Sequence, residues 1–479
     1  MQVVVQRQLP PQTDLVAVVI DKSVPVEHLA SALPAEIQAL AAHELSHPRA
    51  DQTTDLLRLA STQSAVDVLL VYPDESGPGA VREALFSAAA KGRLRGKVAV
   101  IVGAHLPAAA EGILLGAYRF NTAGPGTPDA PTHAVLVAPA LSEQSLADTR
   151  AEVERAAALA EMTNWARRLV DTPPGEKTPT VLASTIVEAA AAVGVQTRVW
   201  SPETLAEHGF GGTLGVGRGS ANEPRLVELT LRAGEGSPIV LIGKGVTFDA
   251  GGLSIKNDRT QSWMKADMGG AAAVAAAVVG AARRGLPVNV TALLLLVENM
   301  PSGTAIRPGD VVRHPNGRTT EVTNTDAEGR LLLADALAYA ATFNPAAVVD
   351  VATLTSALLG GDLWMLFSNE DGLANELLEA GDRAGEPGWR LPLLAAMTRH
   401  LDSTVADLKN YSFDHARVDT LAAAAYLSSF VDAFPWAHLD VVGTAFHAST
   451  DRWPAGATGS PTRALMNFLV GRGERGGVQ

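Results

Sequence analysis

The chain has 479 residues, of which 47% are hydrophobic and 19% are charged, and it contains no cysteine. This length exceeds what one ordinary hydrophobic core supports, so we expect two domains. The net charge of −13 disfavours non-specific binding to nucleic acid and to anionic membranes. The lack of cysteine excludes disulfides, thiolate metal sites and thiol nucleophiles, and it fits a cytoplasmic protein.

Neither a signal peptide nor a membrane span is expected. Residues 1–7 lack the long apolar stretch of a signal peptide. The most apolar helix pattern, residues 269–282, is short, consists of small residues and is followed by two arginines. We therefore do not expect it to span a bilayer.

Strand and helix patterns alternate in the first part of the chain, residues 1–142. Strand patterns cover 15–20, 66–72, 98–102 and 134–137, and helix patterns cover 27–44, 80–90 and 108–120. This alternation predicts an α/β domain whose sheet is largely parallel. Residues 121–132 are rich in Gly, Pro and Thr, so we expect an exposed loop there. An amphipathic pattern over residues 143–171 predicts a long helix that connects this domain to the next.

The rest of the chain, residues 172–479, predicts a larger α/β domain with a mixed, mostly parallel central sheet covered by helices. Strand patterns cover 196–200, 225–231, 239–242, 288–296, 347–351 and 436–442, and helix patterns cover 180–192, 269–283, 331–342 and 420–434. Three of the strands are continuous apolar runs, which is typical of central strands buried on both faces. Ligands bind beyond the carboxyl ends of such strands.

Charged residues gather beside these strand and helix ends. Residues 244–256 combine two lysines, one aspartate and three glycines, a composition that suits a site better than a core. Residues 264–267 and 324–330 add further charged side chains. Clusters of carboxylates hold divalent metals, often two of them. The candidate carboxylates are Asp249, Asp267, Asp326 and Glu328, and they are accompanied by Lys244, Lys256 and Arg330.

Each acid could also have a purely structural role. Asp249 fits a turn, and Asp267 fits the N-cap of a helix that begins near residue 269. Residues 325–328 match a capping box at the start of the helix 331–342. Three caps, however, do not require two lysines on one loop or an arginine beside Glu328. We therefore favour the metal site.

Two further patterns are weaker. His43, Glu44 and His47 fit the H-E-x-x-H pattern of zinc peptidases. Because Pro48 would end the helix at once, we interpret this segment as a solvated helix end, with zinc binding as the lesser alternative. Residues 215–220 are glycine-rich but match neither a dinucleotide fingerprint nor a P-loop, so we expect a tight turn.

Residues 243–256, 264–270 and 324–331 closely resemble the motifs of the cytosol (leucyl) aminopeptidase family in residue type, order and spacing. The resemblance extends over the whole second domain and is looser in the first, where residues 110–120 match best. It implies a metal-dependent aminopeptidase whose N-terminal domain is similar to a macro domain. It also implies a homo-hexamer, built as a dimer of trimers.

The resemblance implies a role for each candidate ligand. Asp249 and Glu328 would bridge two divalent metals. Lys244 and Asp267 would complete the shell of one metal, and Asp326 would complete that of the other. A lysine can bind a metal only as the neutral amine, and a neighbouring dication favours the loss of its proton.

The resemblance also implies the catalytic and substrate-binding residues. Lys256 and Arg330 would form the catalytic pair. Lys256 would stabilise the oxyanion of the tetrahedral intermediate, and Arg330 would hold a bicarbonate ion that carries the proton. The substrate pocket would comprise Met264, Asn324, Thr353, Leu354 and Ser356.

The implied reaction is the release of N-terminal residues from peptides. Two metals can share a bridging water or hydroxide and polarise the scissile carbonyl. A metal that also binds the free α-amine makes the enzyme an exopeptidase, so the expected substrates are peptides with a free N-terminus. The mixed nitrogen and oxygen shell suits zinc, manganese or cobalt, and zinc or manganese is expected.

The chain departs from the family pattern at four places. Ala250 stands where the family usually has Ser, and Ser356 stands where it usually has Gly. Residues 415–422 lack the usual Gly-Gly entry to a helix, and residues 459–463 also differ. All seven metal and catalytic positions are intact. The four departures therefore bear on the preference for the N-terminal residue of the substrate and not on the chemistry.

Two roles of other classes remain as alternatives. Some bacterial relatives also act as DNA-binding regulators, although the net charge of −13 disfavours this role here. The macro-like first domain could instead bind a nucleotide such as ADP-ribose.

Overall fold

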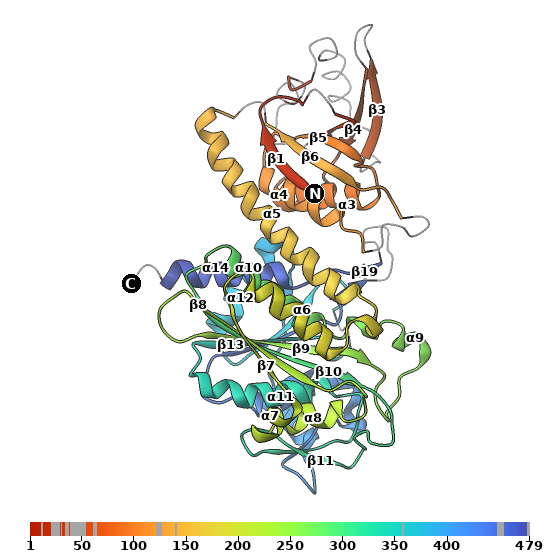
Figure 1. Cartoon of the computed structure of the whole chain (residues 1–479), viewed down its shortest axis with the longest axis vertical. Helices are drawn as coiled ribbons and strands as arrows, with labels where there is room; N and C mark the ends of the chain where they lie inside the picture. The colour runs from red at the N-terminus through yellow and green to blue at the C-terminus, as the bar shows by residue number, and fades with distance from the viewer. Residues whose placement is uncertain are drawn as a thin grey trace. The chain divides into compact units, whose positions relative to one another are not determined.

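The structure is a computed structural model, which describes residues 1–10, 13–20, 29, 31–33, 38, 54–60, 65–120, 127–138, 141–356, 359–447 and 455–476. The chain forms two compact units, one comprising Met1–Asn164 and the other Trp165–Ala448 with Ala455–Gln479. Each unit contains a β-sheet packed against helices (Figure 1). The predicted α/β fold class is therefore confirmed.

The first unit is built on a six-stranded sheet in the order β1-β6-β5-β2-β4-β3. Its strands are β1 (Gln2–Gln6), β2 (Leu15–Val19), β3 (Thr54–Ala60), β4 (Ala65–Val71), β5 (Gly96–Ile101) and β6 (Pro131–Val137). All neighbours run parallel except β3 and β4. Helices α3 (Pro78–Ala90) and α4 (Leu106–Gly116) pack on each other and on the sheet through buried side chains such as Leu85 and Ile113.

The sequence patterns do not predict the two outer strands, β1 and β3. In β1 only Val5 is buried, so this strand lacks the apolar run that marks an inner strand. The helix predicted at 27–44 lies largely outside the described residues, as does half of the loop predicted at 121–132. The long helix predicted at 143–171 is α5 (Glu143–Asp171).

The second unit is built on an eight-stranded sheet in the order β15-β14-β17-β13-β9-β10-β8-β7. Its strands are β7 (Gln196–Trp200), β8 (Arg225–Arg232), β9 (Ile239–Asp249), β10 (Asn289–Asn299), β13 (Ala347–Ala352), β14 (Trp364–Ser368), β15 (Gly388–Arg390) and β17 (Trp436–Asp440). The central strands β17, β13, β9 and β10 run parallel to one another. Strands β7, β8 and β14 pair antiparallel with their inner neighbours, so the sheet is mixed as predicted.

Helices cover both faces of this second sheet (Figure 1). Helices α6 (Pro179–Ala191) and α10 (Gly269–Arg283) pack on one face, and α8 (Gly211–Gly217) and α11 (Gly329–Ala340) pack on the other. Helix α14 (Thr462–Gly476) contacts α10 and α12 (Asp371–Ala384), while α13 (Asp419–Ser428) contacts α11. The short elements are α7 (Pro202–Glu207), α9 (Asp258–Gln261), β11 (Val311–Arg313), β12 (Thr319–Glu321), β16 (Leu408–Lys409), β18 (Phe446–His447) and β19 (Gly456–Ala457).

Strand β9 is longer than the predicted strand 239–242, since it continues to Asp249. The glycine at position 243 suggests a strand end in the sequence, but it has a packing role. A Cβ at Gly243 would lie 2.6 Å from the Cα of Ala271 on α10, so only glycine allows the helix to pack this close. The longer strand places Asp249 at its carboxyl end.

The turn predicted at residues 215–220 is wrong in its first half. Gly215 and Gly217 belong to helix α8, which ends at Gly217. A Cβ at Gly215 would lie 2.9 Å from a side-chain carbon of Ile306, so the glycine reflects close helix packing. The patterns also do not predict β14, β15, α12 and α14.

Helix α10 is the core helix of the second unit. The stretch Met264–Arg283 is long and apolar enough to cross a membrane by length and composition, but 89% of its apolar window is buried inside the fold. Its glycines and alanines let the helix approach the sheet closely. A Cβ at Gly270 would lie 2.0 Å from the carbonyl oxygen of Val351 on β13.

Replacing Gly270 with alanine tests this close approach. We expect Gly270→Ala to lower the free energy of unfolding by about 1–3 kcal/mol, as overpacked cores do, because the new methyl group meets backbone atoms that cannot rotate away. The measurement is the urea midpoint of the second unit. Gly303→Ala is the control, since an added Cβ has nothing within 4 Å there. Equal midpoints for the two variants would contradict a close approach of α10 to β13.

Candidate functional site

The candidate site lies at the carboxyl ends of the central strands of the second unit. Asp249 is the last residue of β9, and Thr353 follows the neighbouring parallel strand β13. Asp267 lies two residues before the first residue of helix α10, and Glu328 is the N-cap of helix α11. Ligands of open α/β sheets bind at this edge, because the loops that follow parallel strands meet there.

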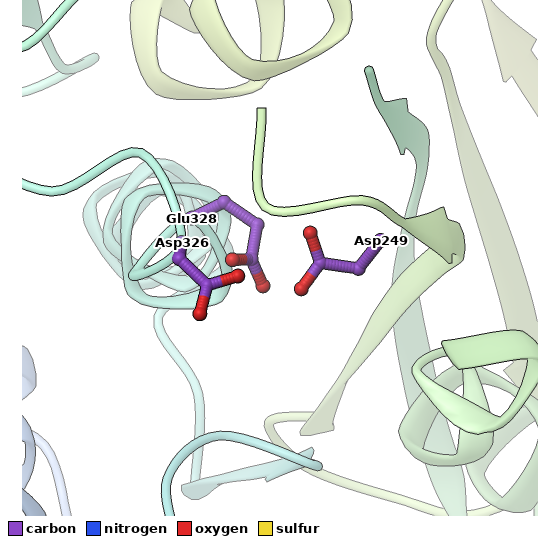
Figure 2. A group of neighbouring side chains, drawn as sticks. All are labelled: Asp249, Asp326 and Glu328. Atoms are coloured by element: carbon purple, nitrogen blue, oxygen red, sulfur yellow. The ribbon is translucent and has the colours of Figure 1, made fainter. Parts of the chain in front are cut away.

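Three carboxylates form the centre of the site. One oxygen from each of Asp249, Asp326 and Glu328 lies within 4.8 Å of the other two. Figure 2 shows these side chains pointing toward one another, Asp249 from the end of β9 and the other two from the segment directly before α11. Asp249 and Glu328 are each only 2% exposed, so water barely screens their repulsion.

Lys244 is the more deeply buried of two lysines in this cluster. Its Nζ lies 2.8 Å from Asp267 Oδ1 and 2.7 Å from Glu328 Oε1. Nζ also donates a hydrogen bond of 2.7 Å to the carbonyl oxygen of Thr353. Burial alone would lower the pKa of Lys244, but the carboxylates of Asp267, Glu328 and Asp249 together raise it. The carboxylates therefore keep Lys244 protonated as long as no other cation neutralises them.

Lys256 balances the other side of the cluster. Its Nζ lies 3.0 Å from Asp249 Oδ2 and 2.5 Å from Asp326 Oδ1. Burial opposes the charge, but Asp249, Glu328 and Asp326 together raise the pKa of Lys256. Its side chain keeps 14% exposure, so this ammonium group lies on the accessible side of the carboxylates.

The carboxylates themselves differ in pKa. Burial raises the pKa of Asp249 well above its ordinary value, and repulsion from Glu328 and Asp267 raises it further. Burial likewise raises the pKa of Asp267 to about 7. Burial would also raise the pKa of Glu328, but Lys244 and Lys256 bring it below its ordinary value. For Asp249 and Asp267, burial and the neighbouring carboxylates together outweigh the effect of the two lysines on the pKa.

Two carboxylate oxygens of the site, Asp267 Oδ2 and Glu328 Oε2, are buried and have neither a hydrogen-bond nor an ion-pair partner among the described residues. A third, Asp326 Oδ1, has no hydrogen bond but is paired with Lys256. Leaving a buried acceptor unpaired costs about 1–3 kcal/mol, so such atoms point to a bound ligand. Carboxylate oxygens with one amine are a donor set for divalent metals. The residues present therefore fit divalent cations.

Side-chain hydrogen bonds join the two loops that carry the site. Thr325 Oγ1 donates to the carbonyl oxygen of Gly251 at 2.6 Å and accepts from the backbone N–H of Ser254 at 2.8 Å. Asn299 Nδ2 donates to Asp249 Oδ1 at 2.8 Å and to the carbonyl oxygen of Thr325 at 3.0 Å. The sequence patterns do not point to Asn299, because the strand predicted there ends at residue 296. In the structure β10 continues to Asn299, which places this amide at the end of the strand.

The purely structural roles considered for two acids are wrong. Helix α11 has no side-chain cap at Glu328, so residues 325–328 form no capping box. The N-cap of α10 is Met268 rather than Asp267. Asp249 does accept a hydrogen bond of 2.8 Å from the N–H of Gly251, so it also shapes a turn. His43 and His47 lie outside the described residues.

Arg330, in the first turn of α11, is 1% exposed. Its Nη1 and Nη2 donate to Asp419 Oδ1 and Oδ2, each at 3.0 Å. Nη1 also donates to the carbonyl oxygen of Asn410 at 2.8 Å. The ring of Tyr411 lies 5.9 Å from the guanidinium carbon. The sequence marks residues 415–422 as unusual, but no pattern in it indicates a role for Asp419 or Asn410.

The five residues expected to form the substrate pocket differ in how directly they are linked to the cluster. The hydroxyl of Thr353 donates to Asp267 Oδ1 at 2.7 Å, so this side chain is part of the cluster. The backbone N–H of Leu354 donates to Asp440 Oδ1 at 3.1 Å, which holds the loop after β13. Met264 belongs to the short helix η3 (Met264–Ala266), and Asn324 lies two residues before Asp326. Ser356 is exposed.

A core of parallel strands that end beside buried carboxylates and lysines offers the donors of a metal-dependent enzyme. Residues 164–466 match the model of the catalytic domain of the cytosol aminopeptidase family. This match covers more than half of the chain, so the chain belongs to the cytosol aminopeptidase family. It is accordingly a metal-dependent aminopeptidase, a hydrolase that acts on peptide bonds, as the sequence resemblance predicts.

Individual relatives agree with this assignment. A protein of Syntrophotalea carbinolica named "Probable cytosol aminopeptidase" is 44% identical over 370 residues, which are 75% of this chain and 73% of the relative. A protein of Mycobacterium ulcerans with the same name is 40% identical over 415 residues, 82% and 78% of the two chains. The structure of the bottromycin maturation enzyme BotP matches with a TM-score of 0.82 and 38% identity, covering 97% of this chain and 100% of BotP. BotP has also been solved in complex with Mn.

Divalent metal should stabilise the folded protein, because it neutralises buried carboxylates. We expect Mn²⁺ or Zn²⁺ to raise the thermal unfolding temperature of chelator-treated protein, with about 2.7 kcal/mol gained at a hundred times Kd. Asp249→Asn should lose most of this shift. Asp258→Asn, at an exposed position on α9, should keep it. An undiminished shift in Asp249→Asn would contradict the metal site.

Proposed function

We propose that the site binds two divalent metal ions and that water activated by them releases N-terminal residues from peptides. The observation that carries this proposal is the pair of buried, unpartnered oxygens, Asp267 Oδ2 and Glu328 Oε2, next to three converging carboxylates. A neutral or singly charged ligand would not balance this charge.

Two ions are favoured over one because the donors extend in two directions. Asp249 and Glu328 lie in the middle. Lys244 joins Glu328 to Asp267 on one side. On the other side, Lys256 joins Asp249 to Asp326. We assign Asp249 and Glu328 as bridging ligands, with the outer residues completing one shell each.

Metal ions bound there would supply a hydroxide at neutral pH and polarise the scissile carbonyl. Lys244 would act as a ligand in its neutral form, which requires that a dication replace the positive charge now shared with Asp267 and Glu328. The carbonyl oxygen of Thr353 then keeps the amine oriented, since it accepts a hydrogen bond from Lys244 Nζ.

Lys256 has a different task because it stays charged. Its raised pKa and partial exposure suit it to donate to the carbonyl oxygen of the substrate as negative charge develops there. We propose Lys256 and Arg330 as the catalytic pair.

The substrates we propose are peptides with a free N-terminus, held by Met264, Asn324, Thr353, Leu354 and Ser356. The exposed apolar side chains of Leu253 and Ile255, which precede Lys256 in sequence, offer a surface for a peptide side chain. Since Ser356 stands where the family usually has glycine, selectivity need not be for leucine.

Further parts of the proposal rest on the family. The metals are zinc or manganese, for which the BotP complex with Mn is a precedent in a similar fold. We propose a cytoplasmic homo-hexamer, a dimer of trimers. The proposed domains are a macro-like domain at 1–142, a connecting helix at 143–171 and a catalytic domain at 172–479.

Chelation and refilling should test the reaction. We expect a chelator to abolish release of N-terminal residues from a panel of aminoacyl substrates, and Zn²⁺ or Mn²⁺ to restore it. The same peptides with an acetylated N-terminus should not be cleaved, because they lack the free amine. Cleavage of acetylated peptides, or full activity after chelation, would refute the proposal.

Substitution of Lys256 tests its role in the transition state. We expect Lys256→Ala to lower kcat by about 10²–10³, the typical cost of losing one oxyanion donor, with a smaller change in KM. Steady-state kinetics on metal-loaded protein gives both values. Lys91→Ala, at an exposed lysine outside the site, is the control. Unchanged kcat in Lys256→Ala would remove Lys256 from the mechanism.

A further inference from the structure

The loop that follows β13, residues 353–356, carries three of the five residues proposed to hold the substrate. Its first residue, Thr353, is fixed by the two hydrogen bonds that join it to the carboxylate cluster. Exposure then rises along the loop, since Leu354 and Thr355 are half-buried and Ser356 is exposed. The outer half of the loop therefore needs further contacts if it is to present one conformation to a substrate.

Asp440 provides such contacts. It is the last residue of β17, and it is 1% exposed. Its Oδ1 accepts hydrogen bonds from the backbone N–H of Leu354 at 3.1 Å and from that of Val442 at 3.2 Å. Its Oδ2 accepts a hydrogen bond of 2.6 Å from the hydroxyl of Thr355. One buried carboxylate thus holds the segments that follow two neighbouring parallel strands, β13 and β17.

The hydroxyl of Thr355 has a second contact, because its oxygen lies 3.0 Å from Thr420 Oγ1. An ionised carboxylate only accepts, and a hydroxyl has a single hydrogen to donate. Thr355 therefore donates to Asp440, and Thr420 donates to Thr355. Thr420 is the second residue of α13 and follows Asp419, which pairs with Arg330. Two consecutive hydrogen bonds thus join the helix that holds Arg330 to the outer half of the loop.

Neither Thr355 nor Asp440 takes part in the proposed chemistry. We propose that both are positioning residues, which determine the affinity for the peptide by holding the loop 353–356 in one conformation. This inference rests on the proposed peptidase function. Because Thr353 has its own bonds to the carboxylate cluster, loss of the Thr355 hydroxyl should loosen the outer half of the loop and leave the metal centre intact. The expected effect is therefore on KM and not on kcat.

The test compares the steady-state kinetics of wild type, Thr355→Val, Thr355→Ser and Thr180→Val as full-length, metal-loaded protein. Valine has nearly the shape of threonine but lacks the hydroxyl. Thr355→Val should raise KM about 10-fold, as the loss of one hydrogen bond can, with kcat within about twofold of wild type. Thr355→Ser keeps the hydroxyl and should have a KM close to that of wild type. Thr180→Val, at an exposed position on α6, is the control and should behave as wild type.

Two measurements without turnover complete the test. Calorimetry with the free amino acid that wild type releases fastest should give a weaker affinity for Thr355→Val than for wild type. The rise in thermal unfolding temperature produced by Mn²⁺ should be the same in both proteins. Where Thr355→Val does not fold, Thr420→Val interrupts the same hydrogen bonds at their other end and should raise KM likewise.

Three results would overturn the inference: an unchanged KM in the folded valine variant, a loss confined to kcat, or a serine variant as impaired as the valine variant. A purely structural role for Thr355 predicts the second of these, because it would lower the fraction of active protein without changing its affinity. Wild type that cleaves no peptide with any metal refutes the proposed function instead.

Discussion

The repulsion between buried carboxylates is the constraint on which the rest of the structure depends. Asp249, Asp267 and Glu328 are each less than a tenth exposed, and the first and last of them converge with Asp326. Taken out of water, such groups repel one another strongly and tend to bind protons instead of remaining charged. Burial of this kind persists in a folded protein only where cations compensate it, which the two lysines do in part and divalent metals would complete.

The fold supplies the rigidity that this arrangement requires. Parallel strands bring their carboxyl ends to one edge, so residues far apart in sequence meet without long loops. Close glycine contacts seat α10 against β9 and β13, which fixes the position of Asp267 relative to Asp249. Thr325 and Asn299 then join the loops that carry the acids. Each of these bonds prevents the carboxylates from moving apart to relieve their repulsion.

The basic residues of the site are paired with carboxylates in two ways, one for the two lysines and one for Arg330. Lys244 and Lys256 are placed among carboxylates that outnumber them, so the centre keeps a negative charge and attracts cations. Arg330 and Asp419 form an ion pair through the two Nη atoms, so Asp419 offsets the charge of the arginine. This ion pair gives Arg330 a fixed orientation beside the carboxylate cluster.

The sequence by itself determined the fold class, the central strands and the family, because continuous apolar runs and closely spaced motifs are local signals. It also singled out Lys244, Asp249, Asp326 and Glu328, since charged residues gathered beside predicted strand ends and helix starts seldom serve packing alone. Only the tertiary structure decided that Gly243 continues a strand, that Glu328 is no part of a capping box, and that Asn299 and Asp419 belong to the site. Those outcomes depend on which backbone or side chain lies opposite each residue. Partners such as Arg330 and Asp419 are 89 residues apart, and no local pattern encodes contacts across that separation.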